Sequence, residues 1–260
     1  MRAALAIAAC LVLAACGQRP AQQDSQPAAD ATRITTWLLP TQPGATSPDL
    51  RLDPDGRLLL SWLQADDNGT HRFLFAAADA NGRWQHAPRV IVDDRPLFAN
   101  WADTPHIKAT ADGALWAQWL QRTGSGGGAY DVVLARSTDG GRSWPASIKV
   151  NDDGTETEHG FATMWAEGDD RIGIAWLDGR HTSGHGHGDH HGGGAMTLRS
   201  ATFDVALSRH DESELDASTC DCCQTASAVV EGAPMLAWRD RTDEEIRDIV
   251  VARRVNGTWQ

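Results

Sequence analysis

Segments with helical periodicity are scarce in this sequence, since no stretch repeats apolar residues at helical spacing for more than a turn or two. Basic residues are also few: 23 Lys and Arg stand against 35 Asp and Glu, for a net charge of −12. This deficit argues against nucleic acid or an anionic membrane face as a partner, and it suits cations. Tyrosine occurs once, whereas 11 Trp and 25 Gly fit an all-β chain with many tight turns.

The N-terminal apolar stretch, Ala3 to Ala15, is too short and too rich in small residues for a membrane-spanning helix. It follows a basic start and ends in Leu13-Ala-Ala-Cys16, which resembles a bacterial lipobox. We expect residues 1–15 to be a lipoprotein signal peptide, Cys16 to carry the lipid and residues 16–32 to form a flexible tether. The protein would then be anchored in the bacterial cell envelope, periplasmic or at the outer membrane, and would touch the membrane through the lipid only.

A repeat runs through the rest of the chain. An alternating segment, a Gly turn and a second apolar segment ending in Trp occur at residues 47–63 and again at 104–120. Trp62, Trp119 and Trp176 lie 57 residues apart, and Trp238 follows 62 residues later. Strand-like alternation at a near-constant period is typical of a propeller built from four-stranded blades. We interpret the repeated Trp side chains as packing between blades.

The segment Ser137-Thr-Asp-Gly-Gly-Arg-Ser-Trp144 reads S-x-D-x-G-x-x-W and resembles the Asp-box of the sialidase-like β-propellers. In that family the Asp-box is the turn between the third and fourth strands of a blade. Asp139 can accept N–H bonds within its own turn, Gly141 can adopt a positive φ, and Trp144 can pack under the blade. The resemblance implies an all-β fold, a β-propeller of four-stranded antiparallel blades, formed by residues 33–260.

The repeat and the Asp-box together predict where the blades lie. Four blades are expected at about 46–93, 103–152, 158–217 and from near Cys220 onward, and Arg33 to Leu39 is expected to add an outer strand to the last one. The chain stops at Gln260, where the fourth strand of that blade should begin. Because sialidase-like propellers usually have six blades, we expect an incomplete propeller, truncated at its C-terminus. A closed four-bladed propeller is the alternative.

The start of each blade bears on the ligand. In sialidases an Arg at the start of the first blade binds the substrate carboxylate, and the resemblance places Thr46 at that position. The equivalent positions in the next three blades are predicted to be Asp103, Glu158 and Cys222. We expect these three side chains to point inward and to share one electronegative rim, which argues against sialic acid as a substrate.

Three cysteines within four residues, Cys220-Asp-Cys-Cys223, lie at the predicted start of the fourth blade. One interpretation is a disulfide, either Cys220 to Cys223 or the vicinal Cys222 to Cys223. The other is a soft-metal site, because closely spaced thiolates suit Cu(I) or Zn(II). The sequence leaves both open.

A His-rich, Gly-rich segment runs from His181 to His191. Imidazoles on such a segment can gather around Zn, Cu or Ni, although a neutral insertion has the same composition. We predict auxiliary metal ligands at His185, His187, His190 and His191. Other ligand-binding residues are predicted on the same face of the propeller: Asp103, His106, Glu158, His159, Asp178, Arg180, Arg239, Asp240 and Arg241.

Two classes of function follow from these patterns. In the first, the protein is a monomeric, lipid-anchored propeller whose channel mouth binds a transition-metal ion, a small polar molecule or a glycan. In the second, it is a glycoside hydrolase of the sialidase type, with Asp94, Asp103 and Glu158 as candidate acid–base carboxylates. The missing carboxylate-binding Arg favours the binding function.

Overall fold

The computed structural model describes residues 34–123, 128–182 and 194–260. Leu38–Gln260 forms one compact unit, the second of the two into which the chain divides. The predicted signal peptide, the lipidation site Cys16 and the predicted tether lie outside the described residues. Within the described ranges, no helix is long and apolar enough to cross a membrane.

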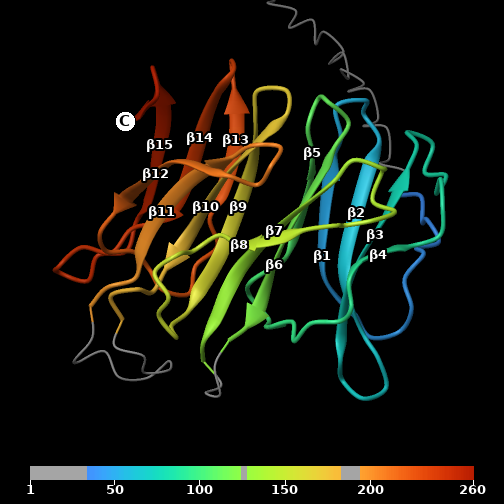
Figure 1. The fold of residues 1–260 in the computed structure, drawn as a ribbon, viewed down its shortest axis with the longest axis horizontal. Coiled ribbons are helices and arrows are strands. Elements are labelled where there is room, and N and C mark those ends of the chain that lie inside the picture. The colour runs from blue at the N-terminus through green and yellow to red at the C-terminus, as the bar shows by residue number, and fades with distance from the viewer. Residues whose placement is uncertain (1–33, 124–127, 183–193) are drawn as a thin grey trace, which may run out of the picture. The chain divides into compact units, whose positions relative to one another are not determined.

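The second unit consists of four antiparallel four-stranded sheets, here called blades one to four (Figure 1). Blade one contains β1 (Ala45–Leu52), β2 (Leu58–Ala65), β3 (His71–Ala78) and β4 (Arg89–Val92), and blade two contains β5 (His106–Ala109), β6 (Leu115–Arg122), β7 (Tyr130–Ser137) and β8 (Ser147–Lys149). Blade three contains β9 (His159–Glu167), β10 (Arg171–Asp178), β11 (Thr197–Phe203) and β12 (Arg209–Asp216). Blade four contains β13 (Ala226–Val230), β14 (Ala233–Arg239), β15 (Ile249–Val255) and β16 (Thr258–Trp259). The predicted all-β propeller architecture is confirmed.

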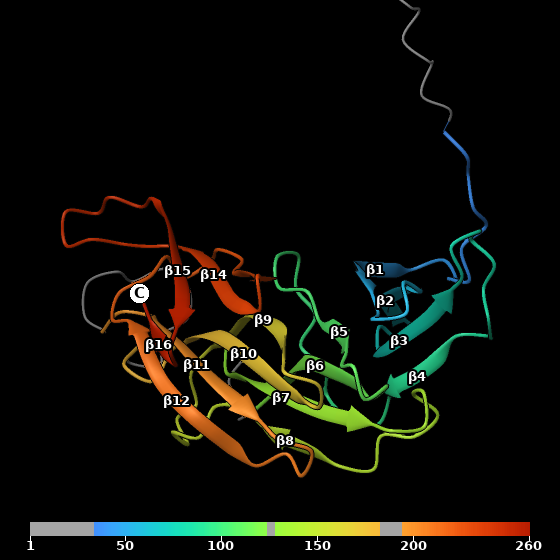
Figure 2. The same cartoon turned by 90° about the horizontal axis from the view of Figure 1, so that it is seen from above.

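The blades follow one another in chain order (Figure 2), and apolar clusters fill the spaces between them. Trp119 packs between blades one and two, Trp176 between blades two and three, and Trp238 between blades three and four. Trp62 lies at the same place in its own second strand and packs with Leu60 and Leu74 of blade one. The repeated Trp residues are therefore in register, and three of them pack between blades as predicted.

The hairpin turns have a shared local cause. Asp53, Asp66 and Asp79 each begin an Asp-x-x-Gly turn, and the Oδ1 atom of each accepts the N–H groups two and four residues later. The Gly of each turn has a positive φ, a conformation that costs glycine nothing. These short turns keep successive strands antiparallel and adjacent.

The Asp-box forms the turn between β7 and β8. Asp139 Oδ1 accepts the N–H groups of Arg142 and Ser143 at 2.9 and 3.0 Å, and Trp144 packs against the core between blades one and two. Gly141 has φ 79°, and a Cβ there would lie 2.4 Å from Cζ of Phe75 in blade one. The turn therefore connects β7 to β8 and also packs against the neighbouring blade.

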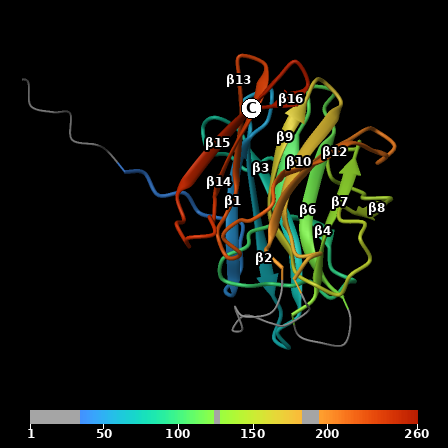
Figure 3. The same ribbon diagram turned by 90° about the vertical axis from the view of Figure 1, so that its left-hand side faces the viewer.

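Strand alternation decides which loops share an end of the sheets. The connections β2–β3, β6–β7 and β10–β11 lie at the end where each blade also joins the next, and the Asp-box turn lies at the opposite end. Blade four lies beside blade three, with β13 next to β9 (Figure 3). The predicted separation of the Asp139 turn from Cys220 follows from this topology.

Two predictions about the chain ends are wrong. Residues 34–39 form no strand, and the carbonyl oxygen of Leu38 instead accepts a hydrogen bond from Trp84 Nε1 in blade one at 2.8 Å. The fourth strand of blade four is already present as β16, because the Asn256-Gly257 turn has positive φ at both residues and reverses the chain early.

Candidate functional site

The start of β9 corrects the predicted ring of equivalent residues. Thr46 pairs with Leu63 in blade one, and Gly160 pairs with Leu177 in blade three, in each case followed by a bulge. Gly160, not Glu158, is therefore the equivalent of Thr46. Glu158 lies two residues earlier and is half-buried. The 57-residue spacing of the Trp residues, applied strictly, would have identified Gly160.

Asp103 does not contribute to an open electronegative rim, because it is buried against blade three. Its Oδ2 atom accepts the backbone N–H of Phe161 at 2.5 Å, while its Oδ1 atom is buried without a hydrogen-bond partner. A Cβ on Gly160 would lie 2.2 Å from Oδ2, so only glycine leaves room for the carboxyl group. Burial raises the pKa of Asp103 to about 7 against the lowering effect of the Phe161 hydrogen bond.

The loop that carries the three cysteines is joined to this same point. Thr225 Oγ1 donates to the carbonyl oxygen of Phe161 at 2.5 Å, and the Gln224 side chain donates to the carbonyl oxygen of Ala102. Phe161 has φ 49°, a conformation that is costly for a bulky residue and that points its N–H and C=O groups to two different blades. Asp103, Phe161 and Thr225 thus connect blades two, three and four.

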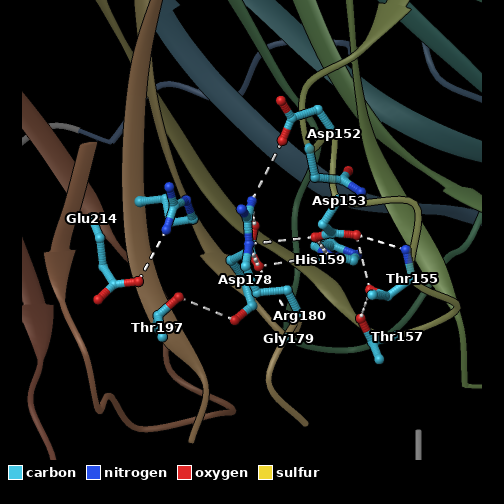
Figure 4. Close-up of polar contacts among 12 residues, drawn as sticks. Asp152, Asp153, Thr155, Thr157, His159, Asp178, Gly179, Arg180, Thr197 and Glu214 are labelled. Carbon is cyan, nitrogen blue, oxygen red and sulfur yellow. Dashed lines mark hydrogen bonds and ion pairs between the residues drawn. The ribbon is translucent and has the colours of Figure 1, made fainter. Parts of the chain in front are cut away.

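Around His159 lies a buried polar network (Figure 4). His159 Nε2 lies 2.8 Å from Asp153 Oδ2 and 3.7 Å from Asp178 Oδ1. Arg180 Nε lies 2.7 Å from Asp178 Oδ1 and 3.5 Å from Asp153 Oδ2, and Trp176 Nε1 donates to Asp178 Oδ2. The predicted residues His159, Asp178 and Arg180 are therefore brought together, with Asp153 as a fourth member.

The surroundings of Asp178 favour its ionised form. Burial raises the pKa of Asp178, but the Arg180 hydrogen bond, the His159 charge and the Trp176 hydrogen bond outweigh burial and lower it. Asp153, His159 and Asp178 have donor atoms close enough to hold a metal ion. Arg180 already occupies both carboxylates, however, so we interpret the network as a support for the mouth of blade three.

The three cysteines form the other cluster with metal-ligating geometry. Their Sγ atoms all lie within 4.8 Å of one another, and Cys220 Sγ is 3.9 Å from Cys222 Sγ. Cys220 is buried, Cys223 is half-buried and Cys222 is exposed. The segment was predicted to start the fourth blade, but it forms a turn before β13, and this turn brings Cys220 and Cys222 together.

Two guanidinium groups face these sulfur atoms. Arg239 Nη1 lies 3.6 Å from Cys223 Sγ and 4.0 Å from Cys220 Sγ, and Arg247 Nη1 lies 3.9 Å from Cys220 Sγ. Arg239 was predicted at the mouth, but Arg247 was missed because it carries no motif. The β14–β15 hairpin places them together, and Arg239 Nε donates to the carbonyl oxygen of Arg247.

The three thiols differ in their acidity. Burial raises the pKa of Cys220, but hydrogen bonds from Cys223, Cys222 and Arg247 more than offset burial and lower it. Burial and the neighbouring Cys220 raise the pKa of Cys222 to about 11. Cys220 is therefore the first of the three to ionise, and it is the one that the protein shields from solvent.

The remaining predicted residues form other pairs. His106 Nδ1 is 3.1 Å from Asp49 Oδ2 at the junction of blades one and two, and the exposed Asp94 lies 3.8 Å from Arg95. Arg241 pairs with Glu245. Asp240 accepts the N–H of Arg241, and its carboxylate helps to raise the pKa of Asp216, for which burial is the main cause. The predicted ligands His185, His187, His190 and His191 lie outside the described residues.

Comparison with known proteins gives structural similarity without sequence similarity. No protein-family model and no curated protein sequence matches the chain. An α-L-arabinanase from Penicillium chrysogenum, solved with arabinobiose, has a TM-score of 0.52 at 13% identity over 83% of this chain. A thermostable family-43 glycoside hydrolase has the same TM-score and identity over 86% of this chain. The chain shares the fold of these glycoside hydrolases. 

The chain covers only part of each of these known structures. The chain spans 64% of the arabinanase and 74% of the family-43 enzyme. A sialidase from Streptococcus pneumoniae aligns over 80% of this chain and 29% of its own at 12% identity, and its TM-score of 0.46 is too low to carry an argument. At these identities the similarity establishes the propeller fold, whereas function has to be argued from the site.

Proposed function

We propose that this protein is a lipid-anchored cell-envelope protein that binds a soft or borderline transition-metal ion through Cys220, Cys222 and Cys223. The observation that carries this proposal is the convergence of the three Sγ atoms within 4.8 Å of one another. Thiolate sulfur prefers Cu(I) and Zn(II) over hard cations such as Ca(II) and Mg(II).

The spacing of the sulfur atoms supports this choice of ligand. Zinc and copper thiolate bonds are about 2.3 Å long, so three sulfurs around one ion lie about 4 Å from one another. Cys220 and Cys222 are already 3.9 Å apart. An ion could therefore be bound with small side-chain rotations and without moving the backbone of the turn.

The test is the metal content of protein purified without oxygen. The wild type is expected to bind about one equivalent of Cu(I) or Zn(II), and a variant with Cys220→Ser, Cys222→Ser and Cys223→Ser none. Asp153→Asn, which alters the other cluster that could hold a metal, should bind as the wild type does. Cys222→Ser alone, at an exposed position, checks that any loss does not come from unfolding. Metal content that is equally low in all four proteins would refute the proposal.

A glycoside hydrolase is the second candidate function, and one observation favours it. The chain shares its fold with an α-L-arabinanase. If this candidate holds, the wild type should cleave aryl arabinosides or related aryl glycosides. A wild type that is inactive on arabinosides, xylosides and sialosides would exclude it.

A further inference from the structure

The cationic groups beside the three sulfurs bear on which metal the site prefers. Arg239 Nη1 contacts both Cys220 Sγ and Cys223 Sγ, and Arg247 Nη1 contacts Cys220 Sγ, all at 3.6 to 4.0 Å. Three thiolates outweigh the charge of a single bound ion, so positive groups at this distance stabilise a metal complex in proportion to the negative charge that it keeps.

Arg239 and Arg247 are held in place by different partners. Arg239 Nε donates to the carbonyl oxygen of Arg247 at 3.0 Å, which fixes the guanidinium toward the sulfurs. Arg247 Nη2 lies 3.0 Å from Glu245, and its Nη1 lies 4.0 Å from Asp221. The charge of Arg247 is therefore partly neutralised by carboxylates, so Arg239 is expected to act more strongly on the sulfurs.

Counting charges distinguishes the two candidate metals. Three cysteines bind a metal as thiolates, so the neutral cluster becomes a complex of charge −2 with Cu(I) and −1 with Zn(II). A nearby positive charge stabilises the copper complex by twice as much as the zinc complex at the same distance. Two arginines would bring the copper complex close to neutrality and would leave the zinc complex with excess positive charge.

We infer that Arg239 and Arg247 make the three-cysteine site selective for Cu(I) over Zn(II). This inference rests on the proposed function, and it adds the identity of the ion and two residues that determine it. Neither residue is a ligand, and each acts through the charge that it places beside the sulfurs. Zn(II) would also require a fourth ligand for its usual tetrahedral geometry, whereas three sulfurs complete a trigonal Cu(I) site.

The experiment compares the affinities of the two metals in charge variants. Dissociation constants for Cu(I) and Zn(II) are measured anaerobically, at one pH and low salt, by competition with a chromophoric chelator for each metal. The proteins are the wild type, Arg239→Gln, Arg247→Gln and Arg239→Lys, which keeps the charge. Arg253→Gln is the matched control, because Arg253 lies on β15, the strand that pairs with β14, and contacts Glu231 instead of a sulfur.

In Arg239→Gln, a weakening of Zn(II) binding by about tenfold should accompany a weakening of Cu(I) binding by about a hundredfold, since the Coulomb energies differ by a factor of two. Arg247→Gln should show the same pattern with a smaller effect. Arg239→Lys and Arg253→Gln should stay close to the wild type. Equal weakening for both metals, or no weakening, would overturn the inference while leaving the metal site intact. A wild type that binds neither metal would refute the proposed function as well.

Discussion

Asp103 shows how one buried side chain joins three blades. Asp103 is 2% exposed, and its carboxyl group fits only because Gly160 has no side chain. The carboxyl group accepts the N–H of Phe161, and the carbonyl oxygen of Phe161 accepts a hydrogen bond from Thr225. A buried carboxyl group with one oxygen left unpaired costs free energy when it is ionised. The residue therefore makes the junction of blades two to four sensitive to pH.

We predict that Asp103→Asn removes a pH dependence of folding stability. The pKa of Asp103 is raised from its usual 3.8 to about 7, so between these values the folded protein holds a proton that the unfolded chain has lost. The free energy of unfolding should then fall as pH rises, by at most about 1.4 kcal/mol per pH unit, and should level off above pH 7. The asparagine variant lacks this decline.

Urea unfolding at pH 4.5, 6 and 8 measures this effect, with the exposed Asp94→Asn as the control. The stability of Asp103→Asn relative to the wild type should increase steadily across the series. Parallel pH profiles for the wild type and both variants would show that Asp103 does not titrate in this range.

At the scale of the element, the turns follow from local chemistry. Asp139 holds its turn with oxygen atoms that accept from Ser137, Arg142 and Ser143, and hydrogen bonds from Ser143 and then Ser137 keep its pKa well below the usual value. The same use of an Asp oxygen recurs at Asp204, between β11 and β12, in a turn that has no Asp-box sequence. The local turn thus persists after the motif has disappeared.

We predict that Gly141→Ala destabilises the protein more than Gly113→Ala. Both glycines have a positive φ, which costs an alanine about 1–2 kcal/mol. Nothing lies within 4 Å of a Cβ on Gly113, whereas a Cβ on Gly141 would collide with the Phe75 ring. Overpacking of a core adds about 1–3 kcal/mol, so the Gly141 variant should lose roughly 2–5 kcal/mol in total.

The denaturation midpoints of the two glycine variants, compared with the wild type, check this expectation. Gly113→Ala reports the cost of the backbone conformation alone. If the two variants lose the same stability, the Phe75 side chain moves to accommodate the added methyl group. The close packing of the Asp-box against blade one then contributes nothing measurable to the free energy of unfolding.

At the scale of the whole molecule, the order of the blades and the proposed membrane attachment depend on different parts of the sequence. The repeat of Trp62, Trp119, Trp176 and Trp238 predicted the order of the blades, because each blade must bury the same face against its neighbour. The proposed attachment of the chain to the membrane rests instead on Leu13-Ala-Ala-Cys16, which resembles a signal that acts before folding.

We predict that Cys16→Ser abolishes lipid attachment. The serine variant should not incorporate a labelled fatty acid and should keep its N-terminal 15 residues. It should be found in the soluble fraction instead of the membrane fraction. Metabolic labelling and fractionation test this, with Cys10→Ser as the control within the predicted signal peptide. A Cys16→Ser variant that fractionates and labels as the wild type does would contradict the anchor.

The sequence by itself determined the blades, their turns and the presence of three neighbouring thiols, because period-two alternation, Asp-x-x-Gly turns and short cysteine spacing act over a few residues. Only the tertiary structure decided what surrounds the thiols. Arg247 contacts Cys220 across 27 residues, and Asp103 meets Phe161 across 58, because hairpin register and blade packing bring them together. The same packing joined His159 and Arg180 through Asp153 in a separate network, although all lie on the face where sequence patterns predicted one site. Such contacts depend on loop length and inter-blade spacing, which leave no local signal in the residues concerned.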